Sequence, residues 1–189
     1  MQWWTGMVWL NEPPHCSVDD GILTLRTARE TDFWQETHYG FRRDDGHFLH
    51  RAIPGDFDAE VVLQLDPNAK YDQAGLMVRR DPGSWLKTSL EFEPDGPSNL
   101  GAVVTNAGLS DWSMQPVTGF AGRLAFRVAR RGTDYTVHAA VDGAALGRIR
   151  LARLHADEGG PILVGPYACS PTGVGCTVAI SSFRVTAAT

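Results

Sequence analysis

The sequence predicts an all-β protein, a β-sandwich. Three observations support this fold class: apolar and polar residues alternate with a period of two, turn residues interrupt the alternation about every 8 to 12 positions, and long segments with helical apolar spacing are absent. The 189 residues contain no linker, low-complexity tract or internal repeat. We therefore expect residues 1–189 to form a single domain of about 12 strands.

In the first third of the chain, GILTLRTA and DAEVVLQLD are typical of strands, because apolar residues alternate with polar ones. Between them, residues 33–53 are predicted to form a hairpin that turns at Asp45-Gly46, a favoured turn pair. The apolar residues of this hairpin alternate poorly, so the sequence does not show which of its side chains face the core.

The clearest alternation lies in GRLAFRVARRG, where Leu124, Phe126 and Val128 are predicted to face the core. The next strand, YTVHAAVDG, ends in Asp142-Gly143. This pair predicts a turn, because both central positions of a type I′ turn need positive φ. The last strand, CTVAISSFRVT, changes phase, and a β-bulge near residues 181–182 would bring its apolar residues onto one face.

The segment YDQAGLMVRRDPGSWLKTSLEFE, residues 71–93, is predicted to be a hairpin. A two-residue Pro-Gly loop would place Arg79 opposite Leu86 and so put a charge on the core face. A three-residue loop, residues 81–83 with Gly83 in the left-handed region, keeps the faces consistent. The expected core face then consists of Ala74, Leu76, Val78, Leu86, Leu90 and Phe92.

The opposite face of this hairpin carries polar and aromatic side chains together. The expected cross-strand pairs are Gln73 with Glu91, Gly75 with Ser89, Met77 with Lys87 and Arg79 with Trp85. Gly75 leaves a dip where another group can approach the backbone. Such a platform suits a sugar, whose C–H faces stack on indole and whose hydroxyls bond with planar polar groups. One alternative is an ordinary surface cation–π pair of Arg79 with Trp85. Another is that a loop covers this strand face.

Composition excludes several classes of partner. The net charge is −5 and there is no Lys/Arg run, which argues against nucleic acid. No apolar run approaches the roughly 18 residues of a membrane span, and the N-terminus lacks the features of a signal peptide. The three cysteines are expected to be reduced thiols in a cytoplasmic protein, although a pairing of Cys169 with Cys176 stays open.

Six stretches of the chain together resemble a known family. They are WLNEP (9–13), DFWQETHYGF (32–41), YDQAGLMVR (71–79), WLKTSLEF (85–92), VVTNAGLSDWS (103–113) and GPYACSP (165–171). They resemble domain-of-unknown-function family 1349, also called regulation-of-enolase-protein-like, over nearly the whole chain. The resemblance implies a concanavalin-like jelly-roll β-sandwich of two curved antiparallel sheets, in a superfamily of lectins and glucanases that place ligands on the concave sheet. The family name implies a regulatory link to enolase in a yeast relative.

Catalytic and metal chemistry find weaker support. Glu91 and Glu93 share a strand face with Cα atoms about 6.5–7 Å apart, which permits glycoside hydrolysis, but Glu93 is expected at the rim. His47 and His50 lie three apart, on opposite strand faces, so one metal ion does not take both. Cys169 is expected in the core. We therefore expect no metal and no cofactor.

We expect a non-catalytic module that binds a carbohydrate or another small polar ligand on the concave sheet. Trp85 and Trp112 would stack on the ligand, Gln73 and Glu91 would take hydroxyls, and Arg79 and Lys87 would favour an anionic or highly oxygenated ligand. One alternative is a glycoside-active enzyme that uses Glu91, and another is a regulatory protein-interaction domain linked to carbohydrate metabolism. The complete set of expected site residues is Trp34, Gln73, Arg79, Trp85, Lys87, Glu91, Asn106 and Trp112.

Overall fold

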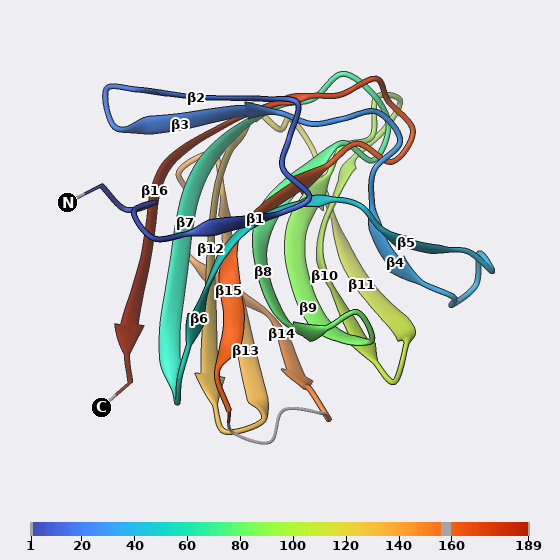
Figure 1. The fold of residues 1–189 in the computed structure, drawn as a ribbon. Coiled ribbons are helices and arrows are strands. Elements are labelled where there is room, and N and C mark those ends of the chain that lie inside the picture. The colour runs from blue at the N-terminus through green and yellow to red at the C-terminus, as the bar shows by residue number, and fades with distance from the viewer. Residues whose placement is uncertain (1, 156–159, 189) are drawn as a thin grey trace.

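The computed structural model describes residues 2–155 and 160–188, and in this part of the chain it contains strands and no helix. Two seven-stranded antiparallel sheets face each other as a jelly-roll sandwich, which confirms the predicted fold class (Figure 1). None of the described segments is a helix long and apolar enough to cross a membrane. The first sheet, sheet A, has the order β1 (Val8–Leu10), β6 (His47–Ile53), β15 (Ile162–Cys169), β8 (Gln73–Asp81), β9 (Ser84–Glu91), β10 (Ser98–Asn106) and β11 (Leu109–Val117).

The second sheet and a small separate hairpin complete the fold. Sheet B has the order β14 (Gly147–Arg153), β13 (Asp134–Val141), β12 (Arg123–Arg131), β7 (Phe57–Asp66), β16 (Thr177–Ala187), β3 (Ile22–Arg26) and β2 (His15–Asp19). The two-stranded sheet consists of β4 (Phe33–Gln35) and β5 (Arg42–Asp44). The 16 strands of the described residues exceed the expected number, because three-residue strands such as β1, β4 and β5 are too short to show alternation.

The main core lies between the two sheets, and the predicted inward faces supply it. Leu124, Phe126 and Val128 of β12 are buried there, as are the expected residues of β8 and β9. The phase change in the last strand is also confirmed, because the register of β16 against β7 shifts between Ile180 and Ser182. The alternation of the long strands therefore predicted the core correctly.

The β8–β9 hairpin has the predicted register but a different turn. Gln73 pairs with Glu91 and Arg79 with Trp85, as expected, but Asp81 pairs with Ser84, and a bulge lies between Arg79 and Asp81. Gly83 does not lie in the left-handed region. The Gly83 amide instead donates a hydrogen bond of 2.7 Å to the Asp81 carboxylate, which stabilises a tighter loop.

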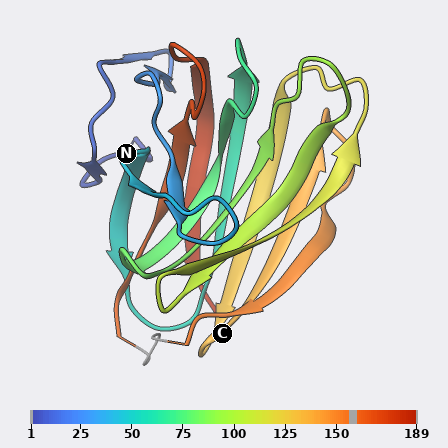
Figure 2. The ribbon, with the colours of Figure 1, turned by 90° about the vertical axis from the view of Figure 1, so that its right-hand side faces the viewer.

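The hairpin predicted over residues 33–53 is wrong. β5 pairs with β4, and β6 pairs with β1 and β15 in sheet A, so Asp45-Gly46 connects two different sheets. The hairpin turn lies earlier, between Gln35 and Arg42, where three residues including Gly40 have positive φ. Figure 2 shows this β4–β5 hairpin, in blue, in front of the green strands of sheet A.

The turn after β13 begins with the predicted Asp142-Gly143 pair. Asp142 and Gly143 both have positive φ, as predicted, although the connection to β14 is longer than a two-residue turn.

Cys16, Cys169 and Cys176 are all free thiols, and Cys16 is exposed. The question of a Cys169–Cys176 bridge is thereby answered in the negative.

Candidate functional site

The face of sheet A that points away from sheet B is covered at one end by the β4–β5 hairpin. Phe33 and Trp34 of the hairpin pack onto apolar residues of the sheet and form a second apolar cluster, separate from the main core. We call it the hairpin-covered cluster; it consists of Phe33, Trp34, Phe48, Met77, Trp85, Val103, Tyr167 and Cys169.

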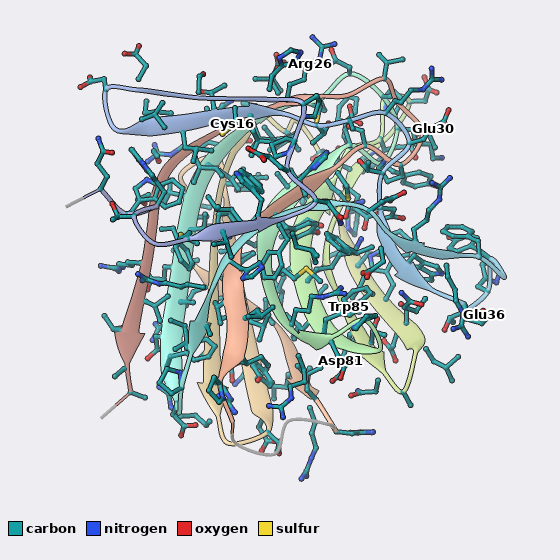
Figure 3. The ribbon with its side chains drawn as sticks, viewed as in Figure 1. Cys16, Arg26, Glu30, Glu36, Asp81 and Trp85 are labelled. Carbon is teal, nitrogen blue, oxygen red and sulfur yellow. The ribbon has the colours of Figure 1, made fainter. Side chains whose placement is uncertain are left out.

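Trp85 and Arg79 help to hold this hairpin in place. Trp85, labelled in Figure 3, lies on β9 and meets the Phe33 ring edge-on. It is fully buried, and its indole N–H donates to the Pro82 carbonyl at 3.0 Å. Arg79 forms a bidentate ion pair with Asp44 of β5 at 2.6 and 2.7 Å, and its guanidinium lies over the Phe33 ring. The expected stacking of a ligand on Trp85 is therefore wrong, and Arg79 is not available for an anion, because the hairpin occupies both side chains.

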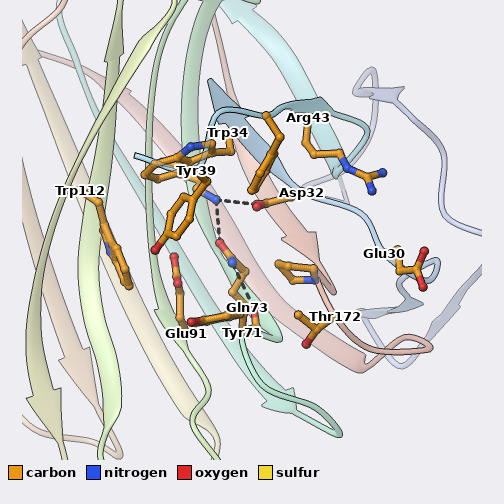
Figure 4. A pocket seen from close by; sticks show the side chains of 13 residues that line it. Glu30, Asp32, Trp34, Tyr39, Arg43, Tyr71, Gln73, Glu91, Trp112 and Thr172 are labelled. Carbon is orange, nitrogen blue, oxygen red and sulfur yellow. Dashed lines mark hydrogen bonds and ion pairs between the residues drawn. The ribbon is translucent and has the colours of Figure 1, made fainter. Parts of the chain in front are cut away.

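Beyond the hairpin, the same face of sheet A opens into a cavity of about 430 Å³ (Figure 4). This volume lies in the range of small-molecule sites, roughly 300–1,000 Å³. The aromatic wall comes from Trp34, Tyr39, Phe41, Tyr71 and Trp112. The polar lining comes from Glu30, Asp32, Arg43, Gln73, Lys87, Glu91 and Thr172, with Pro171 beside it.

A buried polar network forms the floor of this cavity. The Lys87 ammonium donates to Asp32 Oδ1 at 3.0 Å and to Gln73 Oε1 at 2.9 Å. Tyr167 donates its hydroxyl to Gln73 Oε1 at 3.1 Å, and the Gln73 amide donates to the Tyr71 carbonyl at 3.1 Å. Burial lowers the pKa of Lys87, but Asp32, followed by Tyr167, Cys169 and Glu91, together raise it by more, so the net pKa is raised. The expectation that Lys87 attracts an anion is corrected, because Asp32 already neutralises it.

Glu91 is placed differently from the rest of the floor. Its side chain is only 8% exposed, it lines the cavity, and its carboxyl group accepts no hydrogen bond from the described residues. Burial raises the pKa of Glu91 to about 7, with Asp32 adding to the rise and Lys87 opposing it. Glu91 is thus a buried carboxyl group that faces the cavity without a partner among residues 2–155 and 160–188.

The aromatic wall is built largely by the turn of the β4–β5 hairpin. The Trp34 indole N–H donates to the Thr37 carbonyl at 3.0 Å, and the Tyr39 ring meets the Trp34 ring edge-on at 5.3 Å. Tyr39 also stacks on Phe41 at 5.8 Å. Trp112, half-buried on β11, stands on the other side of the cavity. Trp34 and Trp112 therefore both belong to the wall of the cavity, and Trp34 is at the same time part of the hairpin-covered cluster.

Of the eight expected site residues, five line the cavity: Trp34, Gln73, Lys87, Glu91 and Trp112. Asn106 does not, because its amide ties β10 to the end of β14, donating to the Arg153 carbonyl at 2.9 Å and accepting from the His155 amide at 2.8 Å. The expected dip at Gly75 is filled by the neighbouring strand. A Cβ atom there would lie 1.8 Å from the Thr88 carbonyl oxygen, so glycine permits close strand approach.

Sequence reasoning missed Asp32, Tyr39, Phe41 and Tyr71. The first three lie in the stretch DFWQETHYGF, whose density of aromatic and polar residues was the available signal. Glu93, the carboxylate expected at the rim, forms an ion pair with Lys70 at 2.8 Å and does not line the cavity. Besides Glu91, the carboxylates that line the cavity are therefore Asp32 and Glu30, of which Asp32 takes part in the buried floor.

The described residues give little support for a metal or a thiol nucleophile. No group of three or more His, Cys, Asp or Glu side chains gathers as metal ligands in this part of the chain. Both ring nitrogens of His47 are engaged by backbone groups, the Ala28 amide and the Asn11 carbonyl. Burial raises the pKa of Cys169 well above its usual value, which disfavours the thiolate that a nucleophile needs.

Comparisons with known proteins agree with this fold. The family model described as "Protein of unknown function (DUF1349)" matches residues 9–188. The chain is 40% identical over 179 residues to Regulation of enolase protein 1 of Saccharomyces cerevisiae, a match that covers 95% of this chain and 88% of the yeast protein. It also resembles the crystal structure of a functionally unknown protein from Saccharomyces cerevisiae, with a TM-score of 0.89, 38% identity and 98% of both chains covered.

A more distant likeness concerns the fold alone. The GH43 BlXynB protein from Bacillus licheniformis matches with a TM-score of 0.70 and 18% identity. The match covers 94% of this chain but 36% of that protein. At this level of identity the likeness extends to the arrangement of strands and not to the residues of a site.

Proposed function

This chain belongs to the DUF1349 family, and from the geometry of its cavity we propose that it binds a small polyhydroxylated ligand, a mono- or disaccharide, without transforming it. The observation that carries the proposal is the pairing of an aromatic wall with a polar floor in one cavity of about 430 Å³. Sugars need both, because their C–H faces pack on aromatic rings and their hydroxyls need hydrogen-bond partners.

The floor supports binding because it is held rigid before a ligand arrives. Lys87, Asp32, Gln73 and Tyr167 are joined by hydrogen bonds of 2.9–3.1 Å, so their remaining lone pairs and protons point in fixed directions. A preorganised site loses less conformational entropy when a ligand binds. Glu91 adds a carboxyl group whose hydrogen-bonding capacity is unused by the described residues.

A glycan array followed by tryptophan fluorescence titration tests this proposal. We expect at least one neutral or charged saccharide to bind and to change the emission of Trp34 or Trp112. Replacement Trp112→Ala should weaken binding about tenfold, since one stacking ring contributes roughly 0.5–1.5 kcal/mol beyond its area. Met114→Ala is the matched control, because Met114 lies two residues further along β11, is exposed and does not line the cavity.

The result that contradicts the proposal is also defined. An array without hits, together with recovery of enolase in a pull-down, would favour the regulatory alternative that the name of the yeast relative raises.

A second candidate function, glycoside hydrolysis, is favoured by one observation. Glu91 has a pKa of about 7 and shares the cavity with a second carboxylate, Asp32. A carboxyl group that keeps its proton near neutral pH and a second carboxylate are the two groups that glycosidases use. The test is hydrolysis of aryl glycosides: Glu91→Gln should abolish hydrolysis in an enzyme but only weaken binding in a binding module.

A further inference from the structure

The charges around the cavity are matched except at one residue. Lys87 is paired with Asp32, Arg43 with Asp45 at 3.1 Å, and Glu30 with Arg29 at 3.2 Å. Lys70, at the rim, is paired with Glu93 at 2.8 Å. Glu91 forms no ion pair and no hydrogen bond with the described residues, and Lys87 acts on it only as a nearby charge. The cavity therefore presents one unmatched acidic group to a ligand.

This unmatched group is also well buried, which is unusual for a carboxyl group. Buried polar side chains nearly always have a hydrogen-bond partner, and the Glu91 carboxyl group reaches the cavity, so its partner comes from outside the chain, either water or a ligand. Figure 4 shows the Glu91 carboxyl group pointing into the space between Tyr39 and Trp112. An incoming group would meet Glu91 and the aromatic wall together.

The aromatic wall adds a second reason to expect a cation. Tyr39, Tyr71, Trp34 and Trp112 present ring faces or edges to the same cavity as Glu91, and ring faces attract positive charge. Lys70 already lies over the Tyr71 ring, 4.9 Å from its centre, so a cation on this wall has a precedent at the rim. An anionic sugar would instead meet Glu91 at close range and would find both Lys87 and Arg43 already paired.

We propose that the ligand is an amino sugar, whose protonated amino group binds the Glu91 carboxylate while its ring packs on the aromatic wall. The inference rests on the proposed function, because it specifies which saccharide the cavity takes. The charged and titratable groups that surround Glu91 are Asp32, Tyr39, Tyr71, Lys87, Tyr167 and Cys169. Lys87 is the cation among them, and Asp32 neutralises it.

Matched pairs of sugars test the inference directly. Binding of glucose, glucosamine and N-acetylglucosamine, and of the three galactose counterparts, is measured by calorimetry at pH 7. We expect each amino sugar to bind about tenfold more tightly than its neutral partners, the effect of one charge-assisted hydrogen bond. Acetylation removes the charge but keeps the nitrogen, so the N-acetyl sugar should behave like the neutral one.

Two variants locate the effect. Glu91→Gln keeps the shape of the side chain and removes its charge, and it should erase the preference for amino sugars. Glu12→Gln removes the same charge from an exposed position that does not line the cavity, and it should leave the preference intact. Carboxyl NMR of the wild type gives an independent readout, since a bound ammonium group should lower the pKa of Glu91 below about 7.

The possible outcomes separate the two proposals. If neutral sugars bind as tightly as amino sugars, the proposed function stands and the amino-sugar inference is overturned. If the preference survives in Glu91→Gln, the charge does not act through Glu91 and the inference also fails. If none of the six sugars binds, the amino-sugar inference falls, and the glycan array decides whether the proposed function falls with it.

Discussion

The two halves of the outer face of sheet A use the same strands for opposite purposes. On β9, Trp85 is sealed under the β4–β5 hairpin, whereas Glu91, six positions further along the same face, lines an open cavity. Lys87 lies between them and takes part in the polar floor. One alternating face thus changes from packing under a hairpin to lining a cavity within a single strand, depending on where the covering element ends.

The largest expected loss of stability comes from removing a ring from the hairpin-covered cluster. Phe33→Ala should destabilise the protein by about 3–5 kcal/mol, because Phe33 is fully buried between the hairpin, Trp85 and Tyr167. Urea unfolding measures the loss. Phe41→Ala, at an exposed ring of the same hairpin, should lose much less. Equal losses in both variants would show that the hairpin-covered cluster does not stabilise the fold.

The next largest effect comes from replacing Lys87, which lies between Trp85 and Glu91 on β9. Lys87→Met leaves Asp32 without its ion pair and should cost about 3 kcal/mol, at the lower end for buried pairs, because the Asp32 side chain is 14% exposed. The double variant Lys87→Met/Asp32→Asn should recover part of this loss in urea unfolding. A double variant that is less stable than Lys87→Met would contradict the role of charge at this position.

A smaller effect on the free energy of unfolding, with a defined pH dependence, comes from Glu91 in the cavity. The folded state raises the pKa of Glu91 to about 7 from 4.5, so between these values it keeps a proton that the unfolded chain has lost. Wild-type stability should therefore fall as the pH rises through this window, by up to about 3 kcal/mol. Glu91→Gln removes this penalty, and it should be more stable than the wild type at pH 8 but nearly equal at pH 4.

The control for this pH dependence is Glu12→Gln, which should follow the wild type at both pH values. If Glu91→Gln gains no stability between pH 4 and pH 8, the carboxyl group is already ionised in the folded protein. The pKa of about 7 would then be wrong.

The smallest effect concerns the ion pair at the outer edge of the hairpin. Asp44→Asn weakens the bidentate contact with Arg79 and should cost about 1 kcal/mol, since the Asp44 side chain is 35% exposed and water screens the pair. Asp45→Asn changes an ion pair with Arg43 in which both side chains are about half exposed, and it should have almost no effect. Thermal unfolding distinguishes the two, and an equal shift in both would remove any special role for Arg79.

The sequence allowed the long strands and the β8–β9 register to be predicted, because alternation over eight or nine residues fixes which face is buried. It did not reveal the β4–β5 pairing, since strands of three residues show no period. The Lys87–Asp32 pair joins residues 55 positions apart, and the Arg79–Asp44 pair joins residues 35 apart. Such contacts depend on where the β4–β5 hairpin lies, which the sequence does not show. For this reason, Lys87 and Arg79 were expected to be available to a ligand.

The attachment of the β4–β5 hairpin has a consequence for how relatives can diverge. Its two strands form hydrogen-bonded ladders with each other and not with sheet A, and side chains such as Phe33 and Asp44 fasten it to the sandwich. The turn that carries Tyr39 and Phe41 can therefore accept insertions and exchanges without disturbing the ladder of any neighbouring strand. Relatives can therefore differ in this part of the cavity wall while the scaffold beneath it stays unchanged.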